Sequence, residues 1–145
     1  MRFLTLLVIA ISLSACSSVP ANERGWIEPV DAVRAANDDP AYGVRGDFVL
    51  TVKALASYPE RSFLNSETDY RDQRNLTVRM PTSIVPELEQ RLGVRFADLK
   101  NRRIVVTGLA KRARIDFLED GRPSGKYYYQ THVRVDSPTQ VRFAE

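Results

Sequence analysis

One pattern dominates the chain between residues 48 and 135, where apolar side chains occupy every second position over short stretches. In the first stretch Phe48, Leu50 and Val52 alternate with Thr51 and Lys53. A half-buried strand places alternate residues on opposite faces, so a period of two predicts a β-strand. This pattern and the turn residues between stretches predict strands over residues 48–54, 62–66, 76–80, 102–110, 115–118 and 126–135, with a hairpin loop over residues 119–125. We therefore expect a mainly β fold.

One stretch has helical spacing instead. Ile84, Leu88 and Leu92 recur every four residues, Pro81-Thr82-Ser83 is typical of a helix start, and Gly93 favours a helix end. Such spacing places the apolar residues on one side of the helix. The sequence therefore predicts a short amphipathic helix between the third and fourth strands.

The order of these elements resembles a known fold. The residues that carry the resemblance are Phe63-Leu64-Asn65, the strand over residues 76–80, and the run Arg103-Ile104-Val105-Val106-Thr107-Gly108. Over about residues 46–143 the chain resembles the single-domain OB-fold proteins of the bacterial envelope. The resemblance implies a five-stranded Greek-key barrel with one short helix between strands 3 and 4. A β-sandwich and an SH3-like barrel are the alternatives.

The first fifteen residues are typical of a secretory signal peptide. Arg2 provides a positive start, residues 3–11 are apolar, and residues 12–15 are small and less apolar. An apolar stretch of this length is too short to cross a membrane core, which takes about 20 helical residues. We therefore expect residues 1–15 to be removed as a signal peptide rather than to form part of the fold.

The end of this segment, Leu13-Ser14-Ala15-Cys16, resembles the lipobox of bacterial lipoproteins. The resemblance implies that the Cys16 sulfur carries a diacylglyceryl group, and that acyl chains such as palmitate hold the protein to a membrane. Ser17 stands where the family's inner-membrane retention signal has Asp, which implies the outer membrane, facing the periplasm. An ordinary secretory signal with an incidental Cys is the alternative. Cys16 is the only Cys, so acylation excludes disulfides, thiol catalysis and Cys-based zinc sites.

The segment that follows the lipobox differs in charge from the rest of the chain. Residues 16–46 contain three basic and five acidic residues, whereas residues 47–145 contain 17 basic and 13 acidic ones. No sustained apolar period runs through the first of these segments. We therefore expect residues 16–45 to be an acylated flexible tether with at most a short helix over residues 29–36, and residues 46–145 to be the OB-fold-like domain.

Basic residues gather in the second half of the domain. Six cations and no acidic residue fall between residues 100 and 114. Ligands of OB-folds usually cross strands two and three, so the resemblance implies a groove with Tyr58, Arg61 and Arg79 on one side. On the other side of the groove we expect Lys111, Arg112, Arg114, Arg122 and Tyr128. A solvated basic face near the bilayer is the alternative.

Aromatic faces beside cations suit stacked bases, sugars or anionic polymers. We therefore expect a membrane-tethered periplasmic binding or scaffold module without catalysis. Its partner would be a periplasmic protein, a glycan or an anionic lipid headgroup, while the compartment disfavours nucleic acid. No cofactor is expected, because the sequence has no phosphate loop, metal-ligand spacing or cofactor fingerprint.

Catalytic patterns are sparse. His132 is the only His and lies on the polar side of its predicted strand, without a nucleophile at recognisable spacing. Two carboxylate pairs, Asp69 with Asp72 and Glu119 with Asp120, lie in polar loops where such residues are commonly solvated. These loops leave open the alternative of a small metal-dependent hydrolase or nuclease.

Overall fold

The computed structural model describes residues 19–145, so the predicted signal segment and Cys16 lie outside the described residues. The described chain is mainly β, with seven strands in one mixed sheet and two α-helices. The strands are β1 (Val44–Thr51), β2 (Ala54–Ser57), β3 (Arg61–Asn65), β4 (Leu76–Pro81), β5 (Arg103–Glu119), β6 (Arg122–Arg134) and β7 (Val141–Phe143). The helices are α1 (Pro29–Asp38) and α2 (Val85–Leu92), and 3-10 turns cover Thr82–Ile84, Phe96–Leu99 and Pro138–Gln140. Neither α-helix in residues 19–145 has the length and apolar character needed to cross a membrane.

The strand order in the sheet is β1-β5-β6-β4-β3-β2, and β7 pairs with β5. The β4–β6 pair is parallel and the other pairs are antiparallel. The sheet is not closed, and the prediction of five strands is wrong. The predicted first strand is split at Val52 and Lys53, where the chain leaves β5 and joins β3. The amide of Val52 still donates to Arg102 and the amide of Lys53 to Asn65, both at 2.9 Å.

The helix expected over residues 84–92 is α2, but its predicted place between strands 3 and 4 does not match. It lies between β4 and β5, because the first predicted strand is split in two. The opposite error occurs further along the chain, where the predicted strands over residues 102–110 and 115–118 are one long strand, β5.

The hairpin that joins β5 to β6 is tighter than predicted. Only Asp120 and Gly121 lie in the turn, with φ of 51° and 74°, and Glu119 pairs directly with Arg122. Two successive residues with positive φ are typical of a type I′ turn, whose twist matches that of paired strands. The predicted loop over residues 119–125 is therefore mostly strand.

In β4 the core lies on one side of the strand, as the alternation predicts, whereas in β1 and β5 the paired residues Val49 and Val105 are also fully buried, on the face opposite Phe48. Leu76, Val78 and Met80 are at most 1% exposed, whereas Arg79 between them is partly exposed on the other face. Helix α2 adds Leu88, and the following turn adds Leu99, to the same core. All fully buried apolar side chains of the described core lie between residues 27 and 141, so the chain from residue 17 onward contains the whole of it.

The segment predicted to be a flexible tether is packed over much of its described length. Ala32 and Ala36 of α1 are fully buried, because small side chains allow the helix to lie close against β1 and β5. Ile27 is 6% exposed, and its backbone bonds to Asp47 and Val49 of β1. Packing against the core therefore begins well before residue 46, with the partly buried Val19 and then Ile27.

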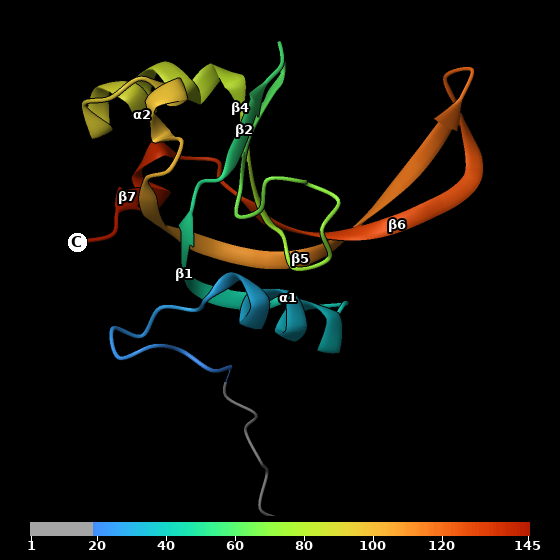
Figure 1. Cartoon of the computed structure of the whole chain (residues 1–145), viewed down its shortest axis with the longest axis horizontal. Coiled ribbons are helices and arrows are strands. Elements are labelled where there is room, and N and C mark those ends of the chain that lie inside the picture. The colour runs from blue at the N-terminus through green and yellow to red at the C-terminus, as the bar shows by residue number, and fades with distance from the viewer. Residues whose placement is uncertain (1–18) are drawn as a thin grey trace, which may run out of the picture.

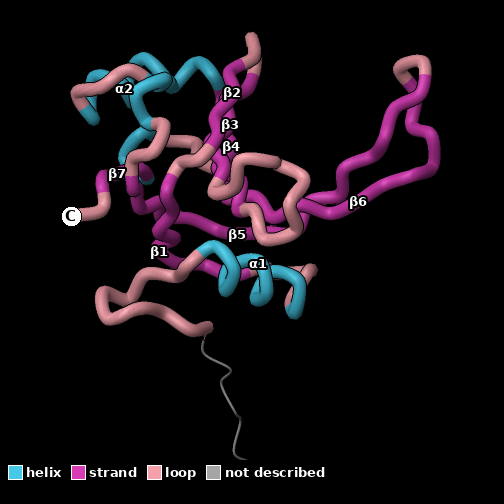
Figure 2. Tube along the Cα trace, viewed as in Figure 1, coloured by secondary structure: helices cyan, strands magenta, loops and turns pink. Residues whose placement is uncertain are grey.

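Two parts of the molecule can be distinguished (Figure 1). The body contains α1, α2 and the strands around the core. The ribbon consists of residues 111–119 of β5 and 122–130 of β6, which extend away from the body as two strands (Figure 2). The candidate site lies where the base of this ribbon meets the body.

Candidate functional site

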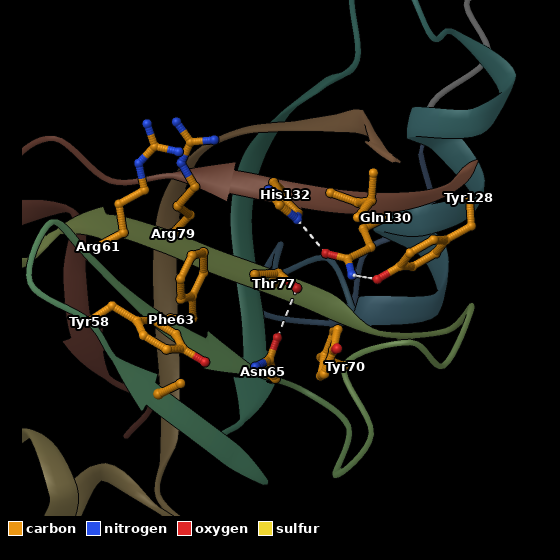
Figure 3. A pocket seen from close by; sticks show the side chains of 12 residues that line it. Tyr58, Arg61, Phe63, Asn65, Tyr70, Thr77, Arg79, Tyr128, Gln130 and His132 are labelled. Atoms are coloured by element: carbon orange, nitrogen blue, oxygen red, sulfur yellow. Dashed lines mark hydrogen bonds between the residues drawn. The ribbon is translucent and has the colours of Figure 1, made fainter. Parts of the chain in front are cut away.

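A cleft of about 390 Å³ opens on the face of the sheet opposite the core. It lies between β2, β3 and β4 of the body and the base of the ribbon (Figure 3). Twelve residues line the cleft: Ala56, Tyr58, Arg61, Phe63, Asn65, Tyr70, Thr77, Arg79, Ile115, Tyr128, Gln130 and His132. The space that these twelve residues line is called the cleft below.

Strand register explains why these side chains meet. Phe63 pairs with Arg79, Asn65 with Thr77, and Thr77 with His132 across three neighbouring strands. Residues that pair in this way point to the same face of a sheet. Their sequence neighbours Leu64, Val78 and Val133 point the other way and are fully buried in the core. The same packing that fixes the core therefore fixes the floor of the cleft.

Two cations stand at one end of the cleft. The side chains of Arg61 and Arg79 lie side by side there (Figure 3). Eight ion pairs join residues of the described chain, and neither Arg61 nor Arg79 takes part in one. Burial, followed by the charges of Arg61 and Arg134, lowers the pKa of the Arg79 guanidinium. Glu60 and Asp136 share a neighbouring hollow with these two cations, but no Asp or Glu lines the cleft itself, so an anion would be favoured on the cleft side.

A chain of hydrogen bonds runs along the β6 side of the cleft. The Nε2 atom of His132 lies 2.7 Å from Oε1 of Gln130, and Nε2 of Gln130 donates to the Tyr128 hydroxyl at 2.7 Å (Figure 3). An amide oxygen can only accept, so Nε2 of His132 carries the proton. Its Nδ1 atom is buried and has no hydrogen-bond partner within residues 19–145.

The imidazole of His132 is neutral at neutral pH. Burial, followed by the charge of Arg79, lowers the pKa of His132 to about 4. A group with such a pKa is a weak base at neutral pH, which is unfavourable for general-base catalysis. Burial also raises the pKa of the Tyr128 phenol, which therefore stays protonated. Both groups are suited to hydrogen bonding rather than to proton transfer.

On the side of the cleft floor away from β6, buried amide side chains form a hydrogen-bond network. Oδ1 of Asn65 accepts from the Thr77 hydroxyl at 2.8 Å and from Nδ2 of Asn75 at 3.1 Å. Asn75 also donates to the carbonyl of Tyr70 at 3.3 Å, which ties the loop after β3 to the sheet. Such a satisfied network holds its members in one arrangement. Tyr70 is thereby positioned at the rim.

Aromatic rings surround this polar floor. The rings of Tyr58 and Phe63 meet edge to face, with centroids 6.1 Å apart. Tyr58 is 62% exposed and Tyr70 47% exposed, so both rings have surface free to contact a ligand. Exposed aromatic faces near cations favour ligands that contain rings.

Of the predicted groove residues, the structure brings four into the cleft: Tyr58, Arg61, Arg79 and Tyr128. Lys111 and Arg112 line a neighbouring hollow, which shares Arg79 and His132 with the cleft. The guanidinium of Arg112 nevertheless lies 4.1 Å from the ring centroid of Tyr129, on the opposite face of the ribbon.

The other two predicted residues lie away from the cleft. Arg114 stacks 4.1 Å from the ring centroid of Tyr127 and forms an ion pair with Asp116 at 2.8 Å. Arg122 pairs with Glu119 in the ladder at the end of the hairpin. The run of cations over residues 100–114 is spread along a strand, so it does not form one surface: Arg103, at its beginning, pairs with Glu28.

Several cleft residues were not predicted as ligand contacts: Phe63, Asn65, Tyr70, Thr77, Gln130 and His132. For most of them, the alternation of side chains along a strand indicates that they share a face with residues that were predicted. Phe63 shares a face with Arg61, and Thr77 with Arg79, while Gln130 and His132 share a face with Tyr128. Tyr70 lies in a loop, where strand alternation gives no information.

The carboxylates of the enzyme alternative have local partners or lie in a turn. Oδ1 of Asp69 accepts from the amide of Arg71 at 2.9 Å. Asp72 binds both the amide and the side chain of Arg74, and these bonds lower the pKa of Asp72 to about 2. In the chain from residue 19 onward, no group of three His, Cys, Asp or Glu is placed to hold a metal ion.

No known protein family, curated protein or solved structure matches the chain. What the cleft binds is therefore inferred from its own chemistry. It offers two cations without an ion-pair partner in residues 19–145, exposed aromatic rings and neutral hydrogen-bonding groups.

Proposed function

We propose that the protein is a membrane-tethered binding module whose cleft binds an acidic glycan without chemically changing it. The observation that carries this proposal is the pair Arg61 and Arg79, which have no ion-pair partner among residues 19–145 and stand in a cleft that no carboxylate lines. A half-buried cation without a partner is unfavourable, and an anionic ligand would supply the missing charge.

The remaining cleft residues support a ligand that carries rings and hydroxyl groups. Tyr58 and Tyr70 present exposed rings on which a sugar can stack. Gln130, His132 and Tyr128 form a neutral hydrogen-bonding row beside them. Uronic acids combine a carboxylate, a ring and hydroxyls in one unit, so an acidic oligosaccharide fits all three features.

We also propose that the sheet is an opened variant of the OB-fold barrel. In this view β1 and β2 act as one bent strand, which pairs with β5 before Val52 and with β3 after Lys53. The parallel β4–β6 pair, and α2 between β4 and β5, support that correspondence. The cleft would then lie on the face where OB-folds commonly bind ligands.

The tether is proposed from the lipobox resemblance. Acylation of Cys16 would anchor the protein in the outer membrane, facing the periplasm. Only Ser17 and Ser18 separate Cys16 from Val19, which packs against the core, and when extended they span at most roughly 10 Å. The cleft would therefore work close to the membrane surface. Cys16→Ser should abolish incorporation of labelled palmitate, and equal labelling of the variant would contradict the anchor.

The binding proposal can be tested with the chain from residue 17 onward. Tetragalacturonate is the acidic probe, and cellotetraose is its uncharged counterpart. Calorimetry should show binding of the acidic probe to the wild type. Replacing Arg61 and Arg79 together by Ala should weaken that binding on the order of tenfold or more. It should also flatten the dependence of affinity on salt, because fewer screened attractions remain.

A matched control removes the same charge elsewhere. Arg34 and Arg95 are both exposed and paired with Asp31 and Asp98 on the body, away from the cleft. Replacing these two by Ala should leave the affinity unchanged. An equal loss in this control, equal binding of cellotetraose, or no binding of tetragalacturonate by the wild type would overturn the proposal. Tighter binding of a thymidine tetranucleotide would assign the cleft to nucleic acid instead.

A further inference from the structure

One edge of β5 lacks a partner strand within the described chain. β1 covers that edge only as far as Val44, which pairs with Ala110, and Gly43 then turns the chain away with a φ of 71°. From Lys111 to Glu119, β5 pairs with β6 alone. Among residues 19–145 no other backbone group bonds to this edge. Unpaired edge amides and carbonyls are a template for another strand.

The two edges of the ribbon differ in how open they are. Asp116 pairs with Tyr127, and Leu118 with Pro123, so one β5 residue lies opposite three residues of β6. The irregularity therefore falls on the β6 edge, which also contains Pro123 and the left-handed Gly125. Bulges, Pro and Gly prevent strand addition. The β5 edge has none of these over residues 111–119.

The ribbon also exposes apolar surface. Phe117 is 47% exposed and Leu118 is 64% exposed. A two-stranded ribbon is only marginally stable by itself in water. Addition of strands along the open edge would extend the sheet and cover part of this surface.

We propose that the open edge of β5 pairs with β5 of a second copy of this chain. The pairing is antiparallel and is centred on Ile115, which lies opposite its own symmetry mate. Arg114 then faces Asp116, and Lys111 faces Glu119, each in both directions across the interface. The edge is thus complementary in charge to itself.

Neighbouring registers lack this complementarity. A two-fold axis perpendicular to the sheet places one residue opposite itself, so each symmetric register is defined by its central residue. Centring on Arg114 would set two guanidinium groups opposite each other, and centring on Asp116 would set two carboxylates opposite each other. Like charges directly opposite are destabilising. Of these three registers, only the one centred on Ile115 avoids a like-charge pair.

In this register, apolar side chains of the two copies also meet on one face and charged side chains on the other. Ala113, Ile115 and Phe117 lie on one face of β5, so Ala113 would meet Phe117 of the second copy on an apolar stripe. Arg114 and Asp116, already an ion pair within one copy, lie on the other face and would form a four-membered charge cluster. Ile115 lines the cleft, so the two clefts would open on the same side of the extended sheet.

Charge reversal tests this register. In the chain from residue 17 onward, the wild type should dimerise in sedimentation equilibrium at submillimolar concentration. Arg114→Asp and Asp116→Arg should each weaken dimerisation on the order of tenfold, because each places like charges opposite. An equimolar mixture of the two variants should restore it, as should the double variant that carries both changes. Circular dichroism of each variant checks that it folds.

A cross-linking test is independent of charge. The chain from residue 17 onward contains no Cys, so Ile115→Cys in it should form a disulfide-linked dimer under mild oxidation. Leu118→Cys is the control, since its symmetry mates would lie roughly 20 Å apart along the strands. A monomeric wild type, no restoration in the mixture, or equal cross-linking of the control would overturn the proposal. None of these outcomes depends on whether the cleft binds a glycan.

Discussion

The two halves of β5 form one continuous strand but have very different surroundings. Over residues 103–110 the strand has β1 on one edge and β7 on the other, and Ile104 and Val106 are fully buried. Over residues 111–119 it has β6 alone, and Phe117 and Leu118 are about half exposed or more. A single strand can therefore be buried at one end and exposed at the other, because burial depends on what packs against each part. In this molecule the covered half belongs to the packed body, whereas the open half contributes Ile115 to the cleft, and we propose that it pairs with a second copy.

The largest effect expected from this comparison is the loss of folding when a charge is placed in the covered half of β5, compared with a charge placed in the open half. Val106→Asp should abolish folding, because an unpaired buried charge costs several kcal/mol against a total stability of about 5 to 15 kcal/mol. Leu118→Asp, at an exposed position of the same strand, should fold normally. Thermal unfolding followed by circular dichroism distinguishes the two. Similar losses in both variants would show that the halves of β5 are not differently packed.

A smaller effect tests whether α1 belongs to the body. Ala32 is fully buried, so Ala32→Leu should overpack the contact with the sheet and lower the free energy of unfolding by about 1 to 3 kcal/mol. Arg34→Leu, on the exposed side of α1, should change it by less than about 0.5 kcal/mol. Urea denaturation measures both values. If Ala32→Leu were neutral, residues 29–38 would be a loosely attached tether after all.

A third effect concerns pH at the junction of body and ribbon, where His132 lies. The pKa of His132 is lowered to about 4 in the folded protein, so below its ordinary value of 6.5 the unfolded chain binds a proton that the folded chain does not. Stability should therefore fall as pH decreases from about 6.5 toward 4, by about 1 to 2 kcal/mol at pH 5.

The control for this pH effect is His132→Gln, which removes the titrating group. Its free energy of unfolding, measured by urea denaturation, should change little between pH 7.5 and pH 5. The pKa of Asp72 and that of Asp47 are lowered from 3.8, so these groups act only at more acidic pH. A wild type as stable at pH 5 as at pH 7.5 would contradict the burial of the imidazole.

Much of the fold could be predicted because local sequence determines it. The opposite orientations of Val78 and Arg79 follow from alternation alone, and they are confirmed. The split of the first strand at Val52 depends on which strand pairs with each end, and no local residue signals it. Likewise Ala32 and Ala36 are small and unremarkable in sequence, yet they are buried because the sheet passes beside them.

The residues of the site could likewise be predicted where alternation along a strand assigns them to a face. Arg61, Arg79 and Tyr128 come from strands whose outward residues could be assigned by parity. Lys111, Arg112 and Arg114 are consecutive or nearly so, and proximity in sequence suggested one surface. Alternation sends Lys111 and Arg114 to opposite faces, and cation–π contacts then draw Arg112 and Arg114 onto tyrosines of the ribbon. Tertiary partners of this kind cannot be inferred from residue type.

One measurement tests most directly whether the two regions have separate functions. Backbone amide NMR shifts of the chain from residue 17 onward are recorded during addition of tetragalacturonate, and again during dilution of the protein alone. The glycan should shift residues of β3, β4 and the base of β6, centred on Phe63, Arg79 and His132. Dilution should instead shift residues 116–119 of β5 and leave Phe63, Arg79 and His132 unchanged, while Ile115, which lines the cleft and lies in the proposed interface, should respond to both treatments. If tetragalacturonate leaves the cleft amides unchanged, or if Phe63, Arg79 and His132 respond to dilution, the account is wrong.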